Sequence, residues 1–219
     1  MIHASRHATV AFAIAISPLL PSAHAQTTQW PTKSVRVIMP FAPGGAGDVL
    51  ARMIGPKLAE EYGQTFVVDN RSGAGGSLGG ELMVRSAPDG YTIMVGASSY
   101  SANAAYYKLS WDPINGVQPV TQLTKGPFVL AAHPGVQANN IKEFVELARA
   151  KPGTITFGSS GSGGVPHLAG ELFMQMSKTR LIHAPYKGDN PAIIDLLGGH
   201  IQAYWGGPIV LAQIGRAHV

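Results

Sequence analysis

Short apolar segments alternate with segments of helical periodicity along most of the chain. Residues 34–39, which contain Val35, Val37 and Met39, predict a strand, and apolar residues then recur every three or four positions from 48 to 58, as in an amphipathic helix. This alternation favours an α/β fold with parallel sheets and βαβ crossovers. Further strands are expected at 65–68, 91–95, 128–132, 155–157, 181–184 and 201–205, and further helices at 81–87, 141–150, 165–177 and 191–197.

The regular alternation is interrupted between residues 98 and 125, a stretch that contains Pro113 and Pro119. We expect the chain to pass from one lobe to another here, which gives a first lobe at residues 26–124 and a second at 125–213. The apolar pattern of the helix at 165–177 places four side chains on its expected inner face: Leu168, Leu172, Phe173 and Met176.

Both ends of the chain carry patterns that we expect to lie outside the fold. Residues 1–25 combine Arg6, an apolar run too short to span a bilayer, and a small-x-small sequence ending at Ala25, which predicts an export signal cleaved there. The alternative is an apolar core helix. Residues 214–219 follow a helix-compatible run and can be encoded by a common sequencing-adapter stretch, so we expect a non-native tail on a truncated reading frame.

Composition narrows the class of function. The chain has 16 Lys and Arg against 12 Asp and Glu, a formal net charge of +4, and no basic run, so we expect no nucleic-acid partner. The absence of cysteine excludes disulfides, thiolate-ligated metals and a thiol nucleophile, and the scattered histidines lack metal-binding spacing. We therefore expect neither a metal nor another cofactor.

Glycine is the unusual component, with 27 of 219 residues against a usual share of about 7%. Three glycine-rich turns, at 43–48, 70–77 and 158–164, lie between an expected strand and an expected helix. Glycine allows close backbone approach, and the first N–H groups of a helix are unpaired donors that attract carboxylate or phosphate. Each turn alone is better explained by glycine's tolerance of tight turns, whereas for three together an anion site and simple tight turns explain the pattern about equally well.

Known nucleotide motifs are absent from the sequence, since neither G-x-x-x-x-G-K-[ST] nor G-x-G-x-x-G occurs. Residues 75–79 do match G-x-S-x-G, the nucleophile elbow of α/β-hydrolases, with Ser77 as nucleophile. A secreted serine hydrolase is therefore an alternative, although six residues separate Val68-Asp69, at the end of the preceding strand, from Gly76. A purely structural exported protein is a further alternative.

Four motifs follow one another in a defined order. The first is PFAPGGAGD at 40–48, and the second is NRSGAGG at 70–76, followed by APDGYT at 87–92. The third is GSSGSG at 158–163 with HLAGELF at 167–173, and the fourth is PYKG at 185–188 with DLLGG at 195–199. Together they resemble the Bug-type substrate-binding proteins of tripartite tricarboxylate transporters, over about residues 30–207.

This resemblance implies a type II periplasmic-binding-protein fold, with two lobes that each have a central sheet flanked by helices. It implies a periplasmic receptor, not an enzyme, that clasps a small carboxylate between its lobes, and a monomer is expected as the default state. Di- and tricarboxylates, acidic amino acids and aromatic acids all fit, and the membrane subunits of such a transporter are the implied partner. Because family members are longer, the second crossing and a C-terminal part are expected to be missing.

The resemblance also implies which residues form the site. One carboxylate would lie on the turn at Gly44 and Gly45, and Ser159 with Ser160 would meet the other end of the ligand. Asp48 is expected to shape its loop as a helix cap, because an acid facing a carboxylate would repel it. The implied residues are Phe41, Gly44, Gly45 and Asp48 in the first lobe, Ser159, Ser160, Gly163 and His167 in the second, and Lys187 and Gly188 nearby.

Overall fold

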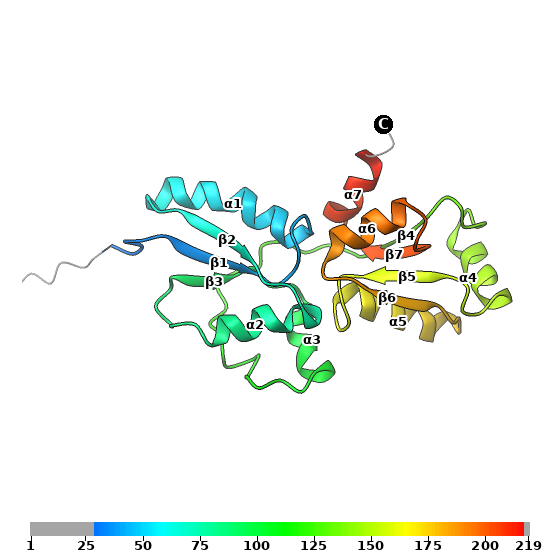
Figure 1. Ribbon diagram of the computed structural model, residues 1–219, viewed down its shortest axis with the longest axis horizontal. Helices are drawn as coiled ribbons and strands as arrows, with labels where there is room; N and C mark the ends of the chain where they lie inside the picture. Colours follow the sequence, from blue (N-terminus) through cyan, green and yellow to red (C-terminus); the bar gives the residue numbers. More distant parts are fainter. Residues whose placement is uncertain (1–28, 217–219) are drawn as a thin grey trace, which may run out of the picture.

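The computed structural model describes residues 29–216, which form two α/β lobes that lie side by side (Figure 1). The expected export signal, residues 1–25, and the last three residues of the expected tail lie outside the described residues. Residues 214–216 form the end of the last helix, α7 (Pro208–Arg216).

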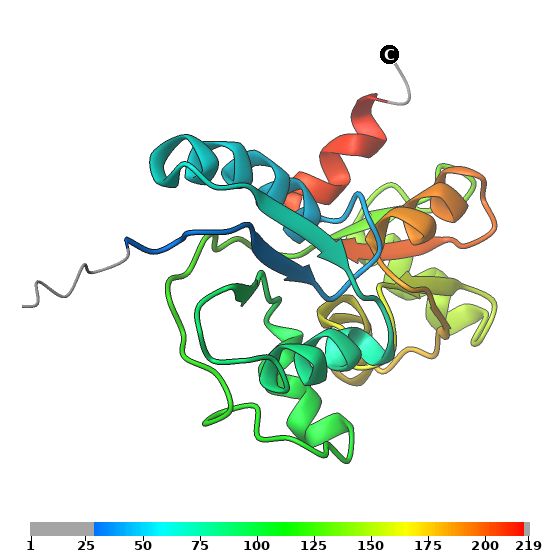
Figure 2. The same cartoon turned by 60° about the vertical axis from the view of Figure 1, so that its left-hand side comes forward.

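The first lobe contains a three-stranded parallel sheet with the strand order β2-β1-β3. Val37 of the central strand pairs with Val68 on one side and with Ile93 on the other, so apolar side chains line the middle of the sheet. Helix α1 covers one face, and α2 and α3 lie together on the opposite face (Figure 2). The elements are β1 (Val35–Met39), α1 (Ala46–Tyr62), β2 (Phe66–Asn70), the short 3-10 helix η1 (Ala74–Gly76), α2 (Ser77–Val84), β3 (Thr92–Met94) and α3 (Ser99–Tyr106).

The second lobe contains a four-stranded sheet with the order β4-β7-β5-β6. Its core clusters around Phe157, which is fully buried and meets the ring of Trp205 edge to face at a centroid distance of 5.3 Å. The elements are β4 (Val129–Ala132), α4 (Ile141–Ala150), β5 (Thr156–Ser159), α5 (Val165–Ser177), β6 (Ile182–Pro185), α6 (Asp189–Leu197), β7 (Ala203–Gly206) and α7.

The expected two-lobed α/β architecture is confirmed, but three details of the prediction are wrong. Strand β4, at the edge of the second sheet, runs antiparallel to β7. Helix α3 lies in the stretch expected to be irregular. The predicted inner face of α5 is displaced, since Leu172 and Met176 are 55% and 77% exposed, and the buried positions are Pro166, His167 and Gly170.

The arrangement of the strands brings the glycine-rich turns to the boundary between the lobes. The carboxyl end of β1 points toward the second lobe, and that of β5 points back toward the first (Figure 1). In parallel sheets, ligands bind beyond the carboxyl ends of the strands. The boundary between the lobes is therefore the place to look for a site.

Candidate functional site

The turns that follow β1 and β5 have the same backbone design. Helix α1 begins after Gly45 and helix α5 after Gly164, and both N-cap glycines have an extended conformation. The residue before each N-cap, Gly44 or Gly163, has a positive φ, of 89° and 77° respectively. A side chain is strained in that conformation, so both turns require glycine where the chain reverses into a helix.

The third residue of each helix reaches back to its turn. In the first lobe, Gly44 N–H donates to Asp48 Oδ2 at 3.0 Å, and in the second, Gly163 N–H donates to His167 Nδ1 at 3.1 Å. The expectation that Asp48 is the N-cap is wrong, because Gly45 holds that position. Its side chain nevertheless shapes the loop by accepting a hydrogen bond from the turn.

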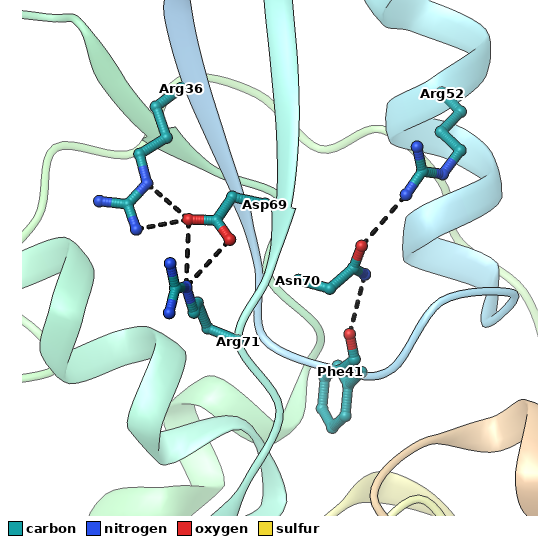
Figure 3. Close-up of polar contacts among 6 residues, drawn as sticks. All are labelled: Arg36, Phe41, Arg52, Asp69, Asn70 and Arg71. Atoms are coloured by element: carbon teal, nitrogen blue, oxygen red, sulfur yellow. Dashed lines mark hydrogen bonds and ion pairs between the residues drawn. The ribbon is translucent and has the colours of Figure 1, made fainter.

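Asp48 belongs to a buried polar network in the first lobe. Its side chain also accepts hydrogen bonds from Arg52 Nε and Asn70 Nδ2, each at 3.0 Å. Asn70 Nδ2 donates at 2.9 Å to the carbonyl of Phe41 as well, which ties β2 to the turn (Figure 3). Burial acts to raise the pKa of Asp48, but these hydrogen bonds outweigh it and hold the pKa below its usual value. The carboxylate is thus a fixed part of the turn.

A second carboxylate anchors the same end of the first sheet. Asp69 accepts hydrogen bonds from the guanidinium groups of Arg36 and Arg71, one on the neighbouring strand and one just beyond β2 (Figure 3). Although burial acts in the opposite direction, these two partners lower the pKa of Asp69. This ion-pair group holds the start of the 71–76 loop against β1.

The second-lobe turn is backed by stacked rings instead of an ion pair. The ring of His167 stacks on His183 with centroids 4.1 Å apart, and His183 stacks in turn on Phe157 at 4.9 Å. His183 Nε2 lies 2.6 Å from the hydroxyl of the fully buried Ser159. Burial is the main cause that lowers the pKa of His183 from 6.5 to about 4.

Neither candidate serine has the geometry of a nucleophile. Ser159 lies beside a histidine, but it has no solvent exposure, and its hydroxyl donates to the carbonyl of Gly161. Ser77 is the first residue of α2 and is separated from the end of β2 by six residues, so it does not lie on a strand-to-helix elbow. The structure therefore offers no support for the hydrolase alternative.

The two lobes touch through backbone at the turns. Ala42 N–H, beside the first turn, donates to the carbonyl of Lys187 at 3.0 Å. A Cβ added to Gly75 would lie 2.2 Å from the carbonyl oxygen of Ser162, so these two loops are also in direct backbone contact. Lys187 itself is exposed and takes part through its main chain, whereas Gly188 is buried against Ala42.

Helix α3 extends over the second-lobe turn. Tyr107 donates to the carbonyl of Ser162 at 2.6 Å, and Tyr106 meets the ring of His167 edge to face at 5.6 Å. Asn103 of this helix is fully buried, and its Oδ1 has no hydrogen-bond partner among the described residues. These residues were missed because the sequence from 98 to 125 was expected to be irregular, although its Ser-Ala-Asn-Ala-Ala run is compatible with a helix.

The structure brings most of the expected site residues together. The turn at Phe41, Gly44 and Gly45 faces the segment that begins at Lys187 and Gly188. Asp189 connects this group to Ser160, with which its carboxylate shares a hydrogen bond. Gly163 and His167 face helix α3, and Asp48 and Ser159 lie behind their turns as supports.

Other kinds of site were sought in the part of the chain that the structure describes. Within residues 29–216, no three His, Cys, Asp or Glu side chains gather in a way that could hold a metal ion. Over the same residues, none of the helices has the length and apolar character that crossing a membrane requires.

Comparison with known proteins identifies the family. Residues 50–218 match the family model of the tripartite tricarboxylate transporter family receptor, TctC. Curated relatives from several bacteria are 30–34% identical, and the chain spans only 53–59% of their length. Family and structural neighbours are solute-binding receptors and not enzymes, which rules against the hydrolase alternative.

Three solved structures share both lobes with this chain. A protein of R. palustris with adipate, Rpa4515, superposes with a TM-score of 0.82 at 32% identity, over 86% of this chain and 64% of that one. MatC from Rhodopseudomonas palustris with bound malate superposes with a TM-score of 0.81 at 28% identity, over 86% of this chain and 65% of that one. The periplasmic binding protein BugD superposes with a TM-score of 0.78 at 30% identity, over 86% of this chain and 63% of that one. The chain is thus a member of the tripartite tricarboxylate transporter receptor family, of the Bug type.

Proposed function

We propose that the protein is an extracytoplasmic solute receptor that binds a small carboxylate between its lobes. The observation that carries this proposal is the pair of matching turns, in which the N-termini of α1 and α5 approach the same boundary from opposite lobes. Helix N-termini present unpaired N–H donors and a positive dipole end, which suit a carboxylate. Family membership and the neighbours solved with adipate and malate support the same ligand class.

The proposed ligand contacts divide between the lobes. The main chain at Gly45 and the hydroxyl of Ser160 supply donors, Gly44 lets the turn approach the ligand closely, and Phe41 forms an apolar wall beside the first turn. Asp48, Ser159 and His167 hold the turns in shape. Asn103 adds a buried oxygen that would accept a hydrogen bond from a ligand hydroxyl or amine.

The biological setting follows from the family. We propose that the protein works as a monomer in the periplasm after cleavage at Ala25, and that it delivers its ligand to the membrane subunits of a tripartite tricarboxylate-type transporter. Closure of the two lobes around the ligand would form the surface that those subunits recognise.

Calorimetric titration with adipate, malate and hexanoate tests the ligand class. The purified protein should bind at least one of these acids, and Gly44→Leu or Gly163→Leu should abolish binding because the new side chain would enter the boundary between the lobes. Gly63→Leu is a matched control, since Gly63 also has a positive φ, of 70°, but a Cβ there meets nothing within 4 Å. Unchanged affinity in the first two variants would refute the proposed site.

A further inference from the structure

The segment that begins helix α6 carries a carboxylate into the boundary between the lobes. Residues 187–190 run alongside the first-lobe turn, where Asn190 lies against Gly44 and Asp189 against Gly45. A Cβ added to Gly45 would lie 2.9 Å from Asp189 Oδ2. A side chain of the second lobe thus sits directly at the N-terminus of a first-lobe helix.

Asp189 is held there by hydrogen-bond donors from both lobes. Its carboxylate accepts from the backbone N–H of Ala46, the first residue of α1, and from the hydroxyl of Ser160. The hydroxyl of Tyr204, a fully buried residue of β7, donates to Oδ1. One of these donors, Ser160, is a residue expected to receive the carboxylate of a ligand, and another, Ala46, directly follows the expected turn at Gly44 and Gly45.

No basic group balances this carboxylate. Among residues 29–216, no Lys, Arg or His side chain forms an ion pair with Asp189. Asp48 already places one carboxylate in the first turn of the same helix, although Arg52 pairs with it. Burial raises the pKa of Asp189, as expected for a carboxylate that hydrogen bonds alone must stabilise.

We propose that Asp189 acts as an internal anion that occupies the first-lobe carboxylate subsite and so determines which acids the protein accepts. A ligand with a second carboxylate at this end would have to displace Asp189 from Ala46 and Ser160 or lie beside a like charge in a region shielded from water. A ligand with an uncharged end meets no such cost. The claim that Asp189 selects among acids rests on the proposed function. The claim that Asp189 links the two lobes does not depend on it.

The inference predicts a preference that one substitution should change. Adipate and hexanoate have chains of equal length and differ in the second carboxylate. Asp189→Asn keeps the shape and hydrogen-bonding oxygen of the side chain but removes its charge. The affinity for adipate relative to hexanoate should therefore rise about tenfold or more in this variant, as measured by calorimetry.

Asp195→Asn is a matched control from the same helix. Asp195 also accepts a hydrogen bond from a tyrosine hydroxyl, that of Tyr186 at 2.6 Å, and its hydrogen bonds to the described residues stay within the second lobe. Its substitution should leave the adipate-to-hexanoate ratio unchanged. If Asp189→Asn does not fold, Asp189→Ser removes the same charge with a smaller side chain.

Two measurements separate the outcomes. A ratio that is unchanged or lower in the Asp189 variant overturns the inference, and a lower ratio would make Asp189 a direct contact for the ligand. If no variant binds either acid, the proposed function fails. X-ray scattering of the protein without ligand then tests whether Asp189 links the two lobes. A larger radius of gyration in Asp189→Asn than in Asp195→Asn then supports its role as a link between the lobes, and equal radii reject it.

Discussion

The two glycine turns share a backbone but differ in the side chain that supports them. In the first lobe an aspartate, Asp48, accepts the N–H of the turn glycine, and in the second lobe a histidine, His167, does so. The first is an anion stabilised by hydrogen bonds and an arginine, whereas the second is a neutral acceptor in a stack of rings. The same fold position can therefore be occupied with or without a charge.

Because of this difference, the N-termini of α1 and α5 should attract a bound anion to different degrees. Asp48 and Asp189 both lie at the N-terminus of α1, so that its positive end already has negative partners. At α5, the hydrogen bond to His167 Nδ1 places the proton of the neutral ring on Nε2. A carboxylate should consequently be received more favourably at the second-lobe turn.

Removal of Asp48 should have the largest effect on stability. Asp48→Ala leaves the N–H of Gly44, the guanidinium of Arg52 and the amide of Asn70 without their acceptor. The free energy of unfolding should fall by about 3 kcal/mol in urea titrations. Glu81→Ala, which removes an exposed ion pair with Arg85 and a hydrogen bond from Ser110, should cost far less. Equal losses in the two variants would contradict the supporting role of Asp48.

Lowering the pH should destabilise the second lobe before the first. The expected loss of stability is smaller than that from removing Asp48 and larger than that from removing Glu171. The pKa of His183 is lowered from 6.5 to about 4, so the folded state keeps this ring neutral while the unfolded chain protonates it. The resulting stability is complete above pH 6.5 and is lost as the pH falls toward 4, by roughly 2 kcal/mol once the partial exposure of the ring is allowed for.

Hydrogen exchange that resolves the two lobes measures this effect. Protection of β5 and β6 should decrease between pH 6.5 and 4.5, whereas that of β1 and β2 should change less. His183→Gln removes the titrating ring beside Ser159 and His167 and should flatten the response of the second lobe. A second lobe that responds no more steeply than the first would show that His183 does not control this step.

Loss of Glu171 should have the smallest effect. Its Oε1 lies 3.4 Å from His167 Nε2, but the carboxylate side chain is 51% exposed. Glu171→Gln should therefore change the free energy of unfolding at pH 7 by less than about 0.5 kcal/mol in urea titrations. A loss above about 1 kcal/mol would mean that His167 is doubly protonated, which its acceptance of the Gly163 N–H contradicts.

Much of the fold could be predicted because its periodicity is local. The helices at 141–150 and 165–177 have the predicted bounds, and all seven strands lie within two residues of their predicted bounds at both ends. Helix α2 was expected at 81–87 but begins at Ser77. Its two glycines, which disfavour a helix locally, pack closely against Pro40 and Trp111, and this tertiary packing overrides the propensity.

The site was predictable at its turns and not across the boundary between the lobes. Gly44, Gly45, Ser160 and Gly163 lie in motifs that combine glycine with a following helix, a pattern visible in the sequence. Asp189 lies in no such pattern, because its role depends on contact with a helix end more than 140 residues earlier in the chain. Contacts of this kind follow from the packing of the lobes, which periodicity does not encode.

The contact between Gly75 and the carbonyl of Ser162 has a consequence for how far the two lobes can close. Because the atoms in contact belong to the main chain, the backbone limits how closely the two lobes can approach at this point. Two side chains hold this contact in place, since Asn103 donates to the carbonyl of Gly75 and Tyr107 donates to that of Ser162. These two positions are therefore tied to the limit of closure and cannot vary independently of it.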